Sequence, residues 1–562
     1  MSHYKVAPPT VSRHTASIPG TLIVASEDEI LIRLETLNRI GAALSSDRDM
    51  GSLMERIVEA ARQFTLADGV TLYRKEGETL FFDVLRNNTL RLFEGGFSGK
   101  PIRLAPIALM LADGSENHSL VVTHAALTGN TVNIVDAYDE PGFDFSGTRA
   151  FDAKNGYRSE SFLTVPMKDH AGDIIGVLQL INAKGTDGAV RAFSDADRQL
   201  VESLASQAAI ALNNRRLIEQ MAELFESLIK LINSAIDEKS PYTGGHCERV
   251  PALTMMLADA AAQSALGPMA GFRMSDADRY ELKIAGLLHD CGKITTPVHV
   301  VDKATKLETL FDRIQVVDTR FEVLLRDAEI ALLRGELSET DYATRMAQLR
   351  ADRETVRVSN KGGEFMSDAA VAEIERIAMH QWRGVDGQPQ PLLNSEETMN
   401  LSIRRGTLND AEREIINYHI VSTIRMLEAL PWPPHLKKVP EYAGGHHERM
   451  DGKGYPRGLT REQMSVPARV MGIADVFEAL TASDRPYKSA KSLSESIQIL
   501  GRMKVGNHID PDLFDVFLRE RVYLTYAQQF LDPKQIDRID WQQVPGVDAE
   551  LAEFLSATDA SD

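Results

Sequence analysis

Seven residues of the kind that bind metal constrain the fold of this chain more than any other feature of its sequence. They are five histidines and two aspartates in short signatures: Thr243-Gly-Gly-His246, His289-Asp290, Asn417-Tyr-His419, His446-His447 and Ile473-Ala-Asp475. Imidazole nitrogens and carboxylate oxygens suit iron, manganese, nickel, cobalt or zinc. Seven ligands are too many for one tetrahedral zinc ion, but they suit two ions with positions left for water and substrate. The chain between the signatures must therefore fold so that they converge.

Asp290 stands out in this set because one carboxylate has two oxygens and can bridge two cations. Two metal ions roughly 3.5–4 Å apart polarise a phosphoryl group and generate hydroxide near neutral pH, which phosphodiester hydrolysis requires. Lys293 lies three residues after Asp290, on the same helical face, and can neutralise a phosphate oxygen. Gly292, between them, leaves room for substrate or backbone to approach closely. We expect Asp290 and Lys293 to be catalytic residues.

The string His446-His-Glu-Arg-Met-Asp-Gly-Lys-Gly-Tyr-Pro456 predicts a shaped loop beside the metals. Gly452 and Gly454 permit positive φ, and Pro456 stiffens the exit from the loop. Basic residues in and near the string supply positive charge for an anionic substrate. They are Arg449, Lys453, Arg457, Arg485 and Lys488.

The chain as a whole is acidic, with 62 basic and 81 acidic residues and a net charge of −19. Such a body repels polyanions, so we expect neither a nucleic-acid polymer nor a membrane among its partners. Two cysteines cannot form a disulfide framework. No signal-peptide core occurs, and no window reaches the roughly 18 apolar residues of a membrane helix. The expected location is the cytoplasm.

Hydrophobic periodicity divides the chain into an α+β half and an all-α half. Helical spacing from Ile30 to Leu66 gives way to strand patterns at Val70–Tyr73, Leu80–Leu85, Thr131–Val135, Phe162–Met167 and Ile174–Ile181. These patterns predict an antiparallel sheet with flanking helices and a hairpin turn at Gly172-Asp173. Capping-box patterns that begin at Ser194, Ser275 and Asn409 predict helix starts. The expected parts are a flexible tail (1–28), the α+β domain (29–190), a connecting helix (191–237), an all-α domain (238–531) and an acidic tail (532–562).

The connecting helix carries apolar residues at coiled-coil spacing. Steps of 4, 3, 4 and 3 separate Leu217, Met221, Leu224, Leu228 and Leu231. This average of 3.5 residues predicts a parallel homodimer. The alternative is a helix that packs on its own domain.

A charged, amphipathic stretch from Phe311 to Asp352 stands apart from the rest of the helical half. It breaks at Gly335 and restarts at Ser338-Glu-Thr-Asp341, which predicts a helical hairpin. The stretch carries no cluster of ligand-type residues.

The region from about Ala235 to Phe530 resembles an HD-GYP phosphodiesterase of the HD metallohydrolase superfamily, through His289-Asp290 and Gly454-Tyr455-Pro456. The resemblance implies hydrolysis of cyclic di-GMP to pGpG or GMP, or of hybrid cGAMP, with two divalent ions, iron or manganese before nickel, cobalt or zinc. The implied metal ligands are His246, His289, Asp290, His419, His446, His447 and Asp475. The implied substrate contacts are Lys293, Arg449, Asp451, Gly454, Tyr455, Pro456, Arg485 and Lys488.

Two features depart from that family's pattern. Some members bind a third metal through a Glu four residues before the histidine that corresponds to His246, and Tyr242 stands at that position here. We therefore expect two metals. The family usually has a short stretch between the positions of Lys293 and His419, whereas 126 positions separate them here. Residues of about 309–405 are therefore expected to be an insertion.

The N-terminal half, from about Ile30 to Asn213, is similar to a GAF domain. The resemblance lies in Val135–Ser146, in Gly156-Tyr-Arg-Ser159 and in Ile175–Asn182. It implies a domain that binds a small ligand, whose identity stays open, or that dimerises. We expect it to tune the helical domain through the connecting helix. The alternatives to a phosphodiesterase are a cyclic-dinucleotide receptor without turnover and an HD hydrolase of another nucleotide.

Overall fold

The computed structural model describes Arg39, Gly41 and residues 49–239, 245–265, 267–363, 365–483 and 490–559. The chain forms two compact units, Met1–Leu224 and Phe225–Asp562. Within the described residues, no helix combines the length and apolar character needed to cross a membrane.

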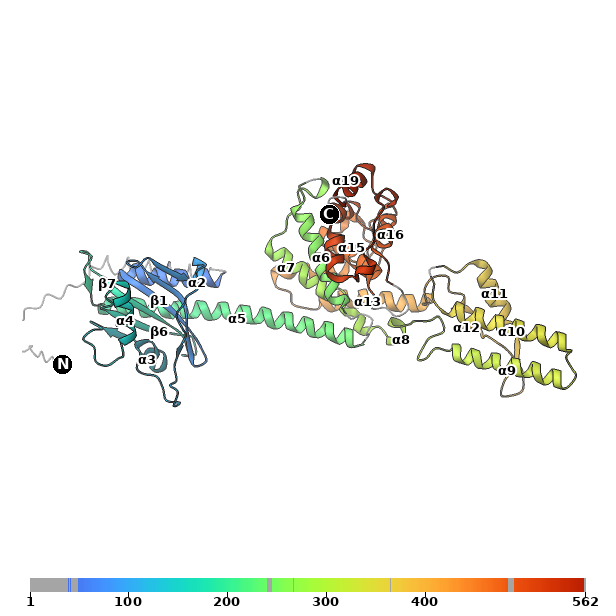
Figure 1. The fold of residues 1–562 in the computed structure, drawn as a ribbon, viewed down its shortest axis with the longest axis horizontal. Coiled ribbons are helices and arrows are strands. Elements are labelled where there is room, and N and C mark those ends of the chain that lie inside the picture. Colours follow the sequence, from blue (N-terminus) through green and yellow to red (C-terminus); the bar gives the residue numbers. More distant parts are fainter. Residues whose placement is uncertain are drawn as a thin grey trace, which may run out of the picture. The chain divides into compact units, whose positions relative to one another are not determined.

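The first unit is built on one antiparallel sheet in the order β3-β2-β1-β7-β6-β5, with β4 beside β2 and β8 beside β7 (Figure 1). Its strands are β1 (Ala67–Glu76), β2 (Thr79–Asn87), β3 (Leu92–Gly95), β4 (Ile107–Ala108), β5 (Val132–Ile134), β6 (Phe162–Lys168), β7 (Ile174–Lys184) and β8 (Val190–Arg191). The expected strands are confirmed. Lys168 pairs with Ile174 across the predicted hairpin, and Gly172 in its turn has φ of 88°.

Helices cover both faces of this sheet. On one face, α2 (Met50–Thr65) and the start of α5 (Asp195–Lys239) bury side chains such as Leu72 and Leu178. On the other face, α3 (Val121–Thr128) packs over alternate residues such as Tyr73 and Phe162, together with Phe145, which directly precedes α4 (Ser146–Asn155). The α+β fold expected for this half is confirmed.

The long helix α5 starts at a capping box, as its sequence predicts. The backbone N–H of Asp197 donates to Ser194 Oγ, and the Ser194 N–H donates to the Asp197 carboxylate. The five residues of the predicted seam are between 45% and 70% exposed. Phe225, Ile229 and Ile236 lie on a different face of α5 and pack into the core of the second unit. The second half of α5 thus packs on the second unit, and the side chains of the seam stay exposed.

The second unit is mainly helical. Outside the insertion, its helices are α6 (His246–Gln263), α7 (Asp276–Leu288), α8 (Val298–Val301), α13 (Asp410–Glu428), α14 (Val439–Gly444), α15 (Val466–Thr481), α16 (Leu493–Val505), α17 (Pro511–Arg519), α18 (Val522–Phe530) and α19 (Ala549–Asp559). Capping boxes at Ser275 and Asn409 start α7 and α13, as predicted. The interior residues of these helices form one continuous apolar core.

The segment between α8 and α13 has a core of its own. It contains α9 (Ile314–Leu333), α10 (Glu339–Asn360), α11 (Asp368–Ala378), β9 (Gln381–Arg383), β10 (Pro389–Pro391) and α12 (Ser395–Leu401). The predicted hairpin is confirmed: α9 and α10 pack together, Gly335 has φ of 71°, and Ser338 caps α10.

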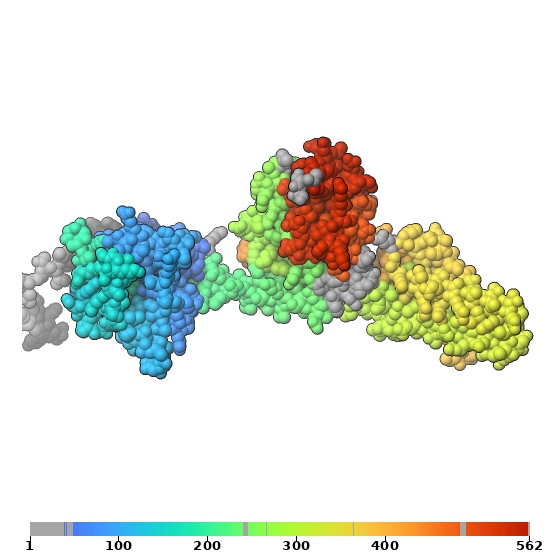
Figure 2. All heavy atoms as spheres, viewed as in Figure 1, coloured from blue at the N-terminus to red at the C-terminus, as the bar shows by residue number. Residues whose placement is uncertain are grey.

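The segment after Leu531, which the sequence set apart as an acidic tail, is part of the second unit. Trp541, Val544, Leu551 and Leu555 are buried in its core. Figure 2 shows the C-terminal part of the chain, coloured red, as part of the packed body of the unit. Acidic composition misled the sequence analysis here, because a few apolar residues suffice to bury this segment.

Asp68 stabilises the first unit from inside the sheet. This buried carboxylate accepts hydrogen bonds from Thr89, Tyr157 and Lys184 at 2.6–2.8 Å. Burial raises the pKa of Asp68, but the hydrogen bonds from Lys184, Thr89 and Tyr157 more than offset it and hold the pKa below its usual value.

We predict that Asp68→Asn lowers the free energy of unfolding of the first unit by about 2 kcal/mol. Scanning calorimetry of the full chain measures this, with Asp139→Asn, an exposed loop position, as control. A depressed carboxylate pKa stabilises the fold above the unfolded pKa, and this stability is lost as the pH falls through the folded pKa. The difference between the two proteins should therefore shrink below about pH 4. Equal transition temperatures at pH 7 would contradict the assignment.

Candidate metal centre

The His289-Asp290 pair lies where α7 ends. Asp290 is the first residue outside a short 3₁₀ helix, η4 (Cys291–Thr295), that follows α7 directly. Both side chains are almost fully buried, at 1% and 3% exposure. The neighbouring Cys291 is free and buried, and it belongs to neither ligand group described below. The end of one helix and the start of the next therefore fix both ligands within two positions.

Gly292 brings this turn into contact with α13. A Cβ atom at this position would lie 2.0 Å from the carbonyl oxygen of His419 and 2.5 Å from the backbone nitrogen of Thr423. The Gly292 N–H also donates to Thr423 Oγ1 at 2.9 Å. The expectation of close backbone approach is met, and the approaching backbone is that of the helix that carries His419.

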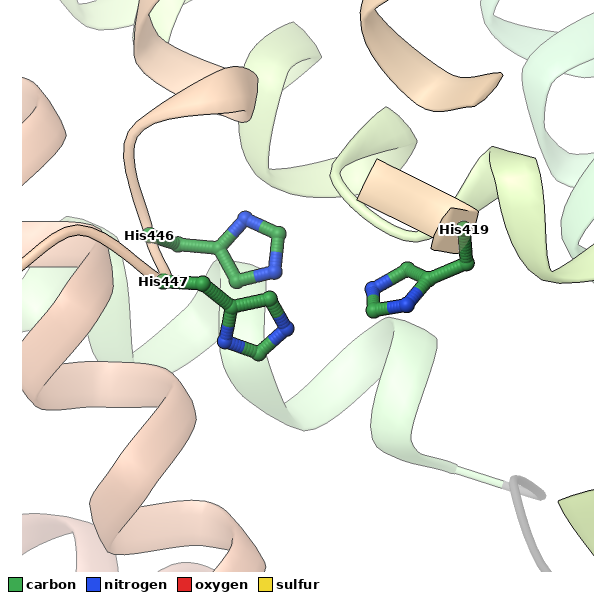
Figure 3. Close-up of side chains that lie close together, drawn as sticks. All are labelled: His419, His446 and His447. Atoms are coloured by element: carbon green, nitrogen blue, oxygen red, sulfur yellow. The ribbon is translucent and has the colours of Figure 1, made fainter. Parts of the chain in front are cut away.

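His446 and His447 follow α14 and face His419 from the opposite side. Figure 3 shows the two neighbouring rings pointing across a small space toward the His419 ring. One nitrogen of each of these three histidines lies within 4.8 Å of the others. They form the first group of candidate ligands.

The second group consists of His246, His289 and Asp290. His246 opens α6, and its Nε2 lies 3.1 Å from Asp290 Oδ2 and 3.3 Å from His289 Nε2. Asp475, on α15, places Oδ1 3.4 Å from His246 Nε2. The structure thus brings Asp475 to the edge of this group.

Asp290 connects the two groups. Its Oδ2 faces His246 and His289, while its Oδ1 lies 3.2 Å from His419 Nε2. All seven histidines and aspartates predicted as ligands therefore lie around one buried centre, and one carboxylate contacts both halves of it.

Backbone carbonyls orient three of the histidine rings. The Nδ1–H groups of His289, His419 and His446 donate to the carbonyl oxygens of Gly286, Ile416 and Ala443, each three residues earlier. Because Nδ1 carries the proton, Nε2 of each ring has a free lone pair directed at the centre.

Glu478 orients the fourth ring and was missed by the sequence analysis. This fully buried carboxylate lies 2.5 Å from His246 Nδ1 and accepts hydrogen bonds from Arg249. A carboxylate behind a metal-binding histidine raises its basicity. In the sequence, Glu478 stands one helical turn after Asp475, which suggests that it lies near the centre. This spacing does not show that its partner is His246 on α6.

The buried polar atoms of the centre fit a metal. Among the described residues, Asp290 Oδ1, His419 Nε2 and His446 Nε2 have no hydrogen-bond partner that meets geometric criteria. Unpaired buried acceptors are costly, and a cation would satisfy all three. The nitrogen and oxygen donor set suits the borderline divalent metals.

The electrostatics hold most ligands in their metal-binding forms. Burial, followed by the neighbouring His447 and His289, lowers the pKa of His446, and burial lowers the pKa of His447 to about 4. Burial raises the pKa of Asp290, but Lys293 and the histidines outweigh it and bring the pKa well below the usual value. For His246, burial lowers the pKa, but the hydrogen bonds with Asp290 and Glu478 raise it to about 9.

The loop after His447 is held by its own residues. Buried Glu448 accepts hydrogen bonds from the N–H groups of Arg457 and Leu459 at 2.7 and 2.9 Å. Tyr455 stacks on His447 with ring centroids 4.8 Å apart. The Tyr455–Pro456 peptide bond is cis. The loop therefore presents Tyr455 beside the centre, as expected for a residue that meets substrate.

Two expectations about this loop need correction. Gly452 has φ of 74° as expected, but Gly454 does not have positive φ. A glycine is needed at position 454 for a different reason, because a Cβ there would lie 2.4 Å from the backbone nitrogen of Arg449. Arg449 and Asp451 pair with each other at 2.8 Å, so much of the charge offered to a substrate is already neutralised. Spacing could not show this, because the two residues approach through the curvature of the loop.

The remaining predicted residues are placed as follows. Lys293 forms an ion pair with Asp290. Lys453 is exposed, and Arg457 pairs with Glu428. Tyr242, Arg485 and Lys488 lie outside the described residues.

A mainly helical domain with a histidine-aspartate pair at its buried polar centre is typical of HD-type metal-dependent hydrolases. The comparisons agree with this class. HD domain family models match residues 243–357 and 393–513, and the GAF domain model matches residues 49–212. The chain therefore carries a GAF domain followed by two stretches that match HD domain models, with residues 358–392 between them.

Among curated relatives, a 3'3'-cGAMP-specific phosphodiesterase 3 from Vibrio cholerae is 25% identical over 51% of this chain and 37% of its own length. The cyclic di-GMP phosphodiesterase PA4108 from Pseudomonas aeruginosa is 38% identical over 23% of this chain and 28% of its own length. A cyclic di-GMP phosphodiesterase from Thermotoga maritima is 31% identical over 30% of this chain and 45% of its own length. The chain thus spans less than half of each of these relatives.

We predict that Gly292→Ala disrupts the metal centre. The added methyl group forces η4 away from α13 and so separates Asp290 from His419. This overpacking lowers the free energy of unfolding by about 1–3 kcal/mol. Metal analysis of the purified protein should show a clear loss of bound metal. Gly271→Ala is the matched control, because a Cβ there meets no atom within 4 Å. A full metal complement in Gly292→Ala would show that this contact does not position the ligands.

Proposed function

We propose that this protein is a metal-dependent phosphodiesterase that hydrolyses cyclic dinucleotides. The observation that supports this most strongly is the division of the Asp290 carboxylate between two ligand groups. A bridging carboxylate between paired divalent ions is the arrangement that phosphodiester hydrolysis uses, since paired ions supply a nucleophile and polarise the phosphoryl group.

The side chains of the chain have distinct tasks in this proposal. His246, His289 and Asp475 would hold one ion, and His419, His446 and His447 would hold the other, with Asp290 available to both. The Lys293 ammonium, which now contacts Asp290 Oδ2, stands beside the phosphate and neutralises charge that develops there. The resemblance to HD-GYP phosphodiesterases makes iron or manganese the preferred pair, and the nitrogen and oxygen donors also suit nickel, cobalt or zinc.

The proposed substrate is cyclic di-GMP, with pGpG or GMP as product. Two of the relatives described above carry that activity in their names, and a third is named for 3'3'-cGAMP. The hybrid dinucleotide is therefore the second candidate substrate.

We predict that Asp290→Ala abolishes hydrolysis while the fold survives. The Asp290 side chain does not cap η4, so its loss removes the bridge without removing a helix cap. Chromatography of cyclic di-GMP incubated with metal-loaded protein should show product for the wild type and none for the variant. Asp276→Ala, an exposed position on α7, is the control and should retain full activity. Product formation by Asp290→Ala, or its absence with the wild type, would refute the proposal.

We further propose that the GAF domain regulates this activity through α5. The helix begins with the capping box of the first unit, and its Phe225, Ile229 and Ile236 are buried in the second. A small ligand of the GAF domain can thus act on a helix that is also part of the catalytic unit.

The exposed seam of α5 supports a parallel homodimer. Leu224 and Leu228 are 61% and 50% exposed, and burial of such side chains drives helix pairing. We predict that Leu224→Glu combined with Leu228→Glu converts a dimer to a monomer in sedimentation experiments. Ala222→Glu, exposed on the same helix but on the face turned away from the seam, should leave the dimer intact. An unchanged mass for the double variant would exclude the seam as the interface.

A further inference from the structure

A groove of about 430 Å³ lies between η4 and the first half of α13. It is lined by Thr295, Thr296, Ala411, Glu414, Ile415 and Tyr418. None of these residues belongs to the ligand groups of the metal centre.

The groove borders the metal centre on the side of His419. Tyr418 directly precedes His419, and Ile415 lies one helical turn before it on the same face, about 6 Å along the axis. On the other wall, Thr295 follows Lys293 by two positions and donates to the Gly292 carbonyl oxygen at 2.8 Å. Since the Gly292 turn packs against the backbone of His419, the two segments that form the groove are the same ones that carry Asp290 and His419.

Two features of the groove suit the flat ring of a nucleobase. Tyr418 is 50% exposed, and its hydroxyl oxygen accepts a hydrogen bond from Arg425, which fixes the ring in place. An exposed aromatic ring next to a phosphate site stacks on a base. Ile415, 43% exposed, adds an apolar contact for the same ring.

The polar groups of the groove favour guanine. Among the described residues, no hydrogen bond or ion pair engages the side chain of Glu414. Its carboxylate can accept hydrogen bonds from both N1–H and the exocyclic amine of guanine. Adenine presents an acceptor at N1, which a carboxylate repels. Thr296 is 2% exposed, and its hydroxyl has no hydrogen-bond partner among the described residues. The wall of the groove therefore keeps one hydroxyl that can form a further hydrogen bond.

From these contacts we infer that the groove binds one guanine base of the substrate, with Tyr418 stacking on it and Glu414 reading its Watson–Crick edge. This inference rests on the proposed function, because the metals must hold the adjoining phosphate. It makes Glu414 a determinant of specificity: cyclic di-GMP and 3'3'-cGAMP both offer a guanine, whereas cyclic di-AMP does not.

The test compares Glu414→Gln with the wild type on cyclic di-GMP, cyclic di-AMP and bis(p-nitrophenyl) phosphate. Glu414→Gln removes the carboxylate that accepts hydrogen bonds from the guanine edge. This loss should raise the KM for cyclic di-GMP about tenfold. The variant should keep wild-type turnover of bis(p-nitrophenyl) phosphate, which has no guanine edge, and should narrow the preference for cyclic di-GMP over cyclic di-AMP. Asp410→Asn, exposed in the first turn of α13 and outside the groove, is the control with the same charge change.

Tyr418 gives a second, independent readout. Tyr418→Ala should raise the KM for cyclic di-GMP about tenfold, and Tyr418→Phe, which keeps the ring, should restore it. An unchanged KM for cyclic di-GMP in both Glu414→Gln and Tyr418→Ala would overturn the guanine site while leaving the phosphodiesterase intact. Failure of the metal-loaded wild type to hydrolyse any of the three esters would instead overturn the proposed function.

Discussion

The candidate metal centre of the second unit depends on one buried carboxylate that contacts two sets of histidines. Burying Asp290 would be unfavourable by itself, because a carboxylate loses its hydration. The Lys293 ammonium and the surrounding imidazoles offset that cost, and they come from α6, α13, η4 and the segment after α14. These segments meet at Asp290. The contacts that neutralise its buried charge are therefore made by the same packing that brings the helices together.

Helix ends perform much of the positioning. His289 and His446 lie at or just after the ends of α7 and α14, where backbone carbonyls no longer have helical partners. Each ring donates Nδ1–H to such a carbonyl three residues earlier, so the helix end gains a hydrogen bond and the ring gains a fixed direction. His246 is the first residue of α6, and the carboxylate of Glu478 performs this task for its Nδ1.

Local features of this fold were readable from the sequence, whereas contacts between distant segments were not. Strand alternation, the capping box at Ser194 and the break at Gly335 each depend on a few neighbouring residues, and all were predicted correctly. The convergence of the seven histidines and aspartates was readable because the chemistry of these side chains is specific even without a fold. Glu478 was not, since a buried glutamate on a helix gives no sign of the histidine it will meet. The pairing of Arg449 with Asp451 and the burial of Trp541 depend equally on tertiary structure.

The segment between α8 and α13 shows how a long stretch of chain can leave the centre undisturbed. It separates the turn that carries Asp290 from the helix that carries His419, so its two ends must be held together. Lys303, with a side chain 1% exposed, pairs with Glu412 at 2.7 Å, and Thr407 donates to the Lys303 carbonyl at 2.9 Å. Glu412 also completes the capping box that starts α13. One buried ion pair thus closes this segment and anchors the helix of His419, so the length of chain beyond it does not affect the distance between the two ligands.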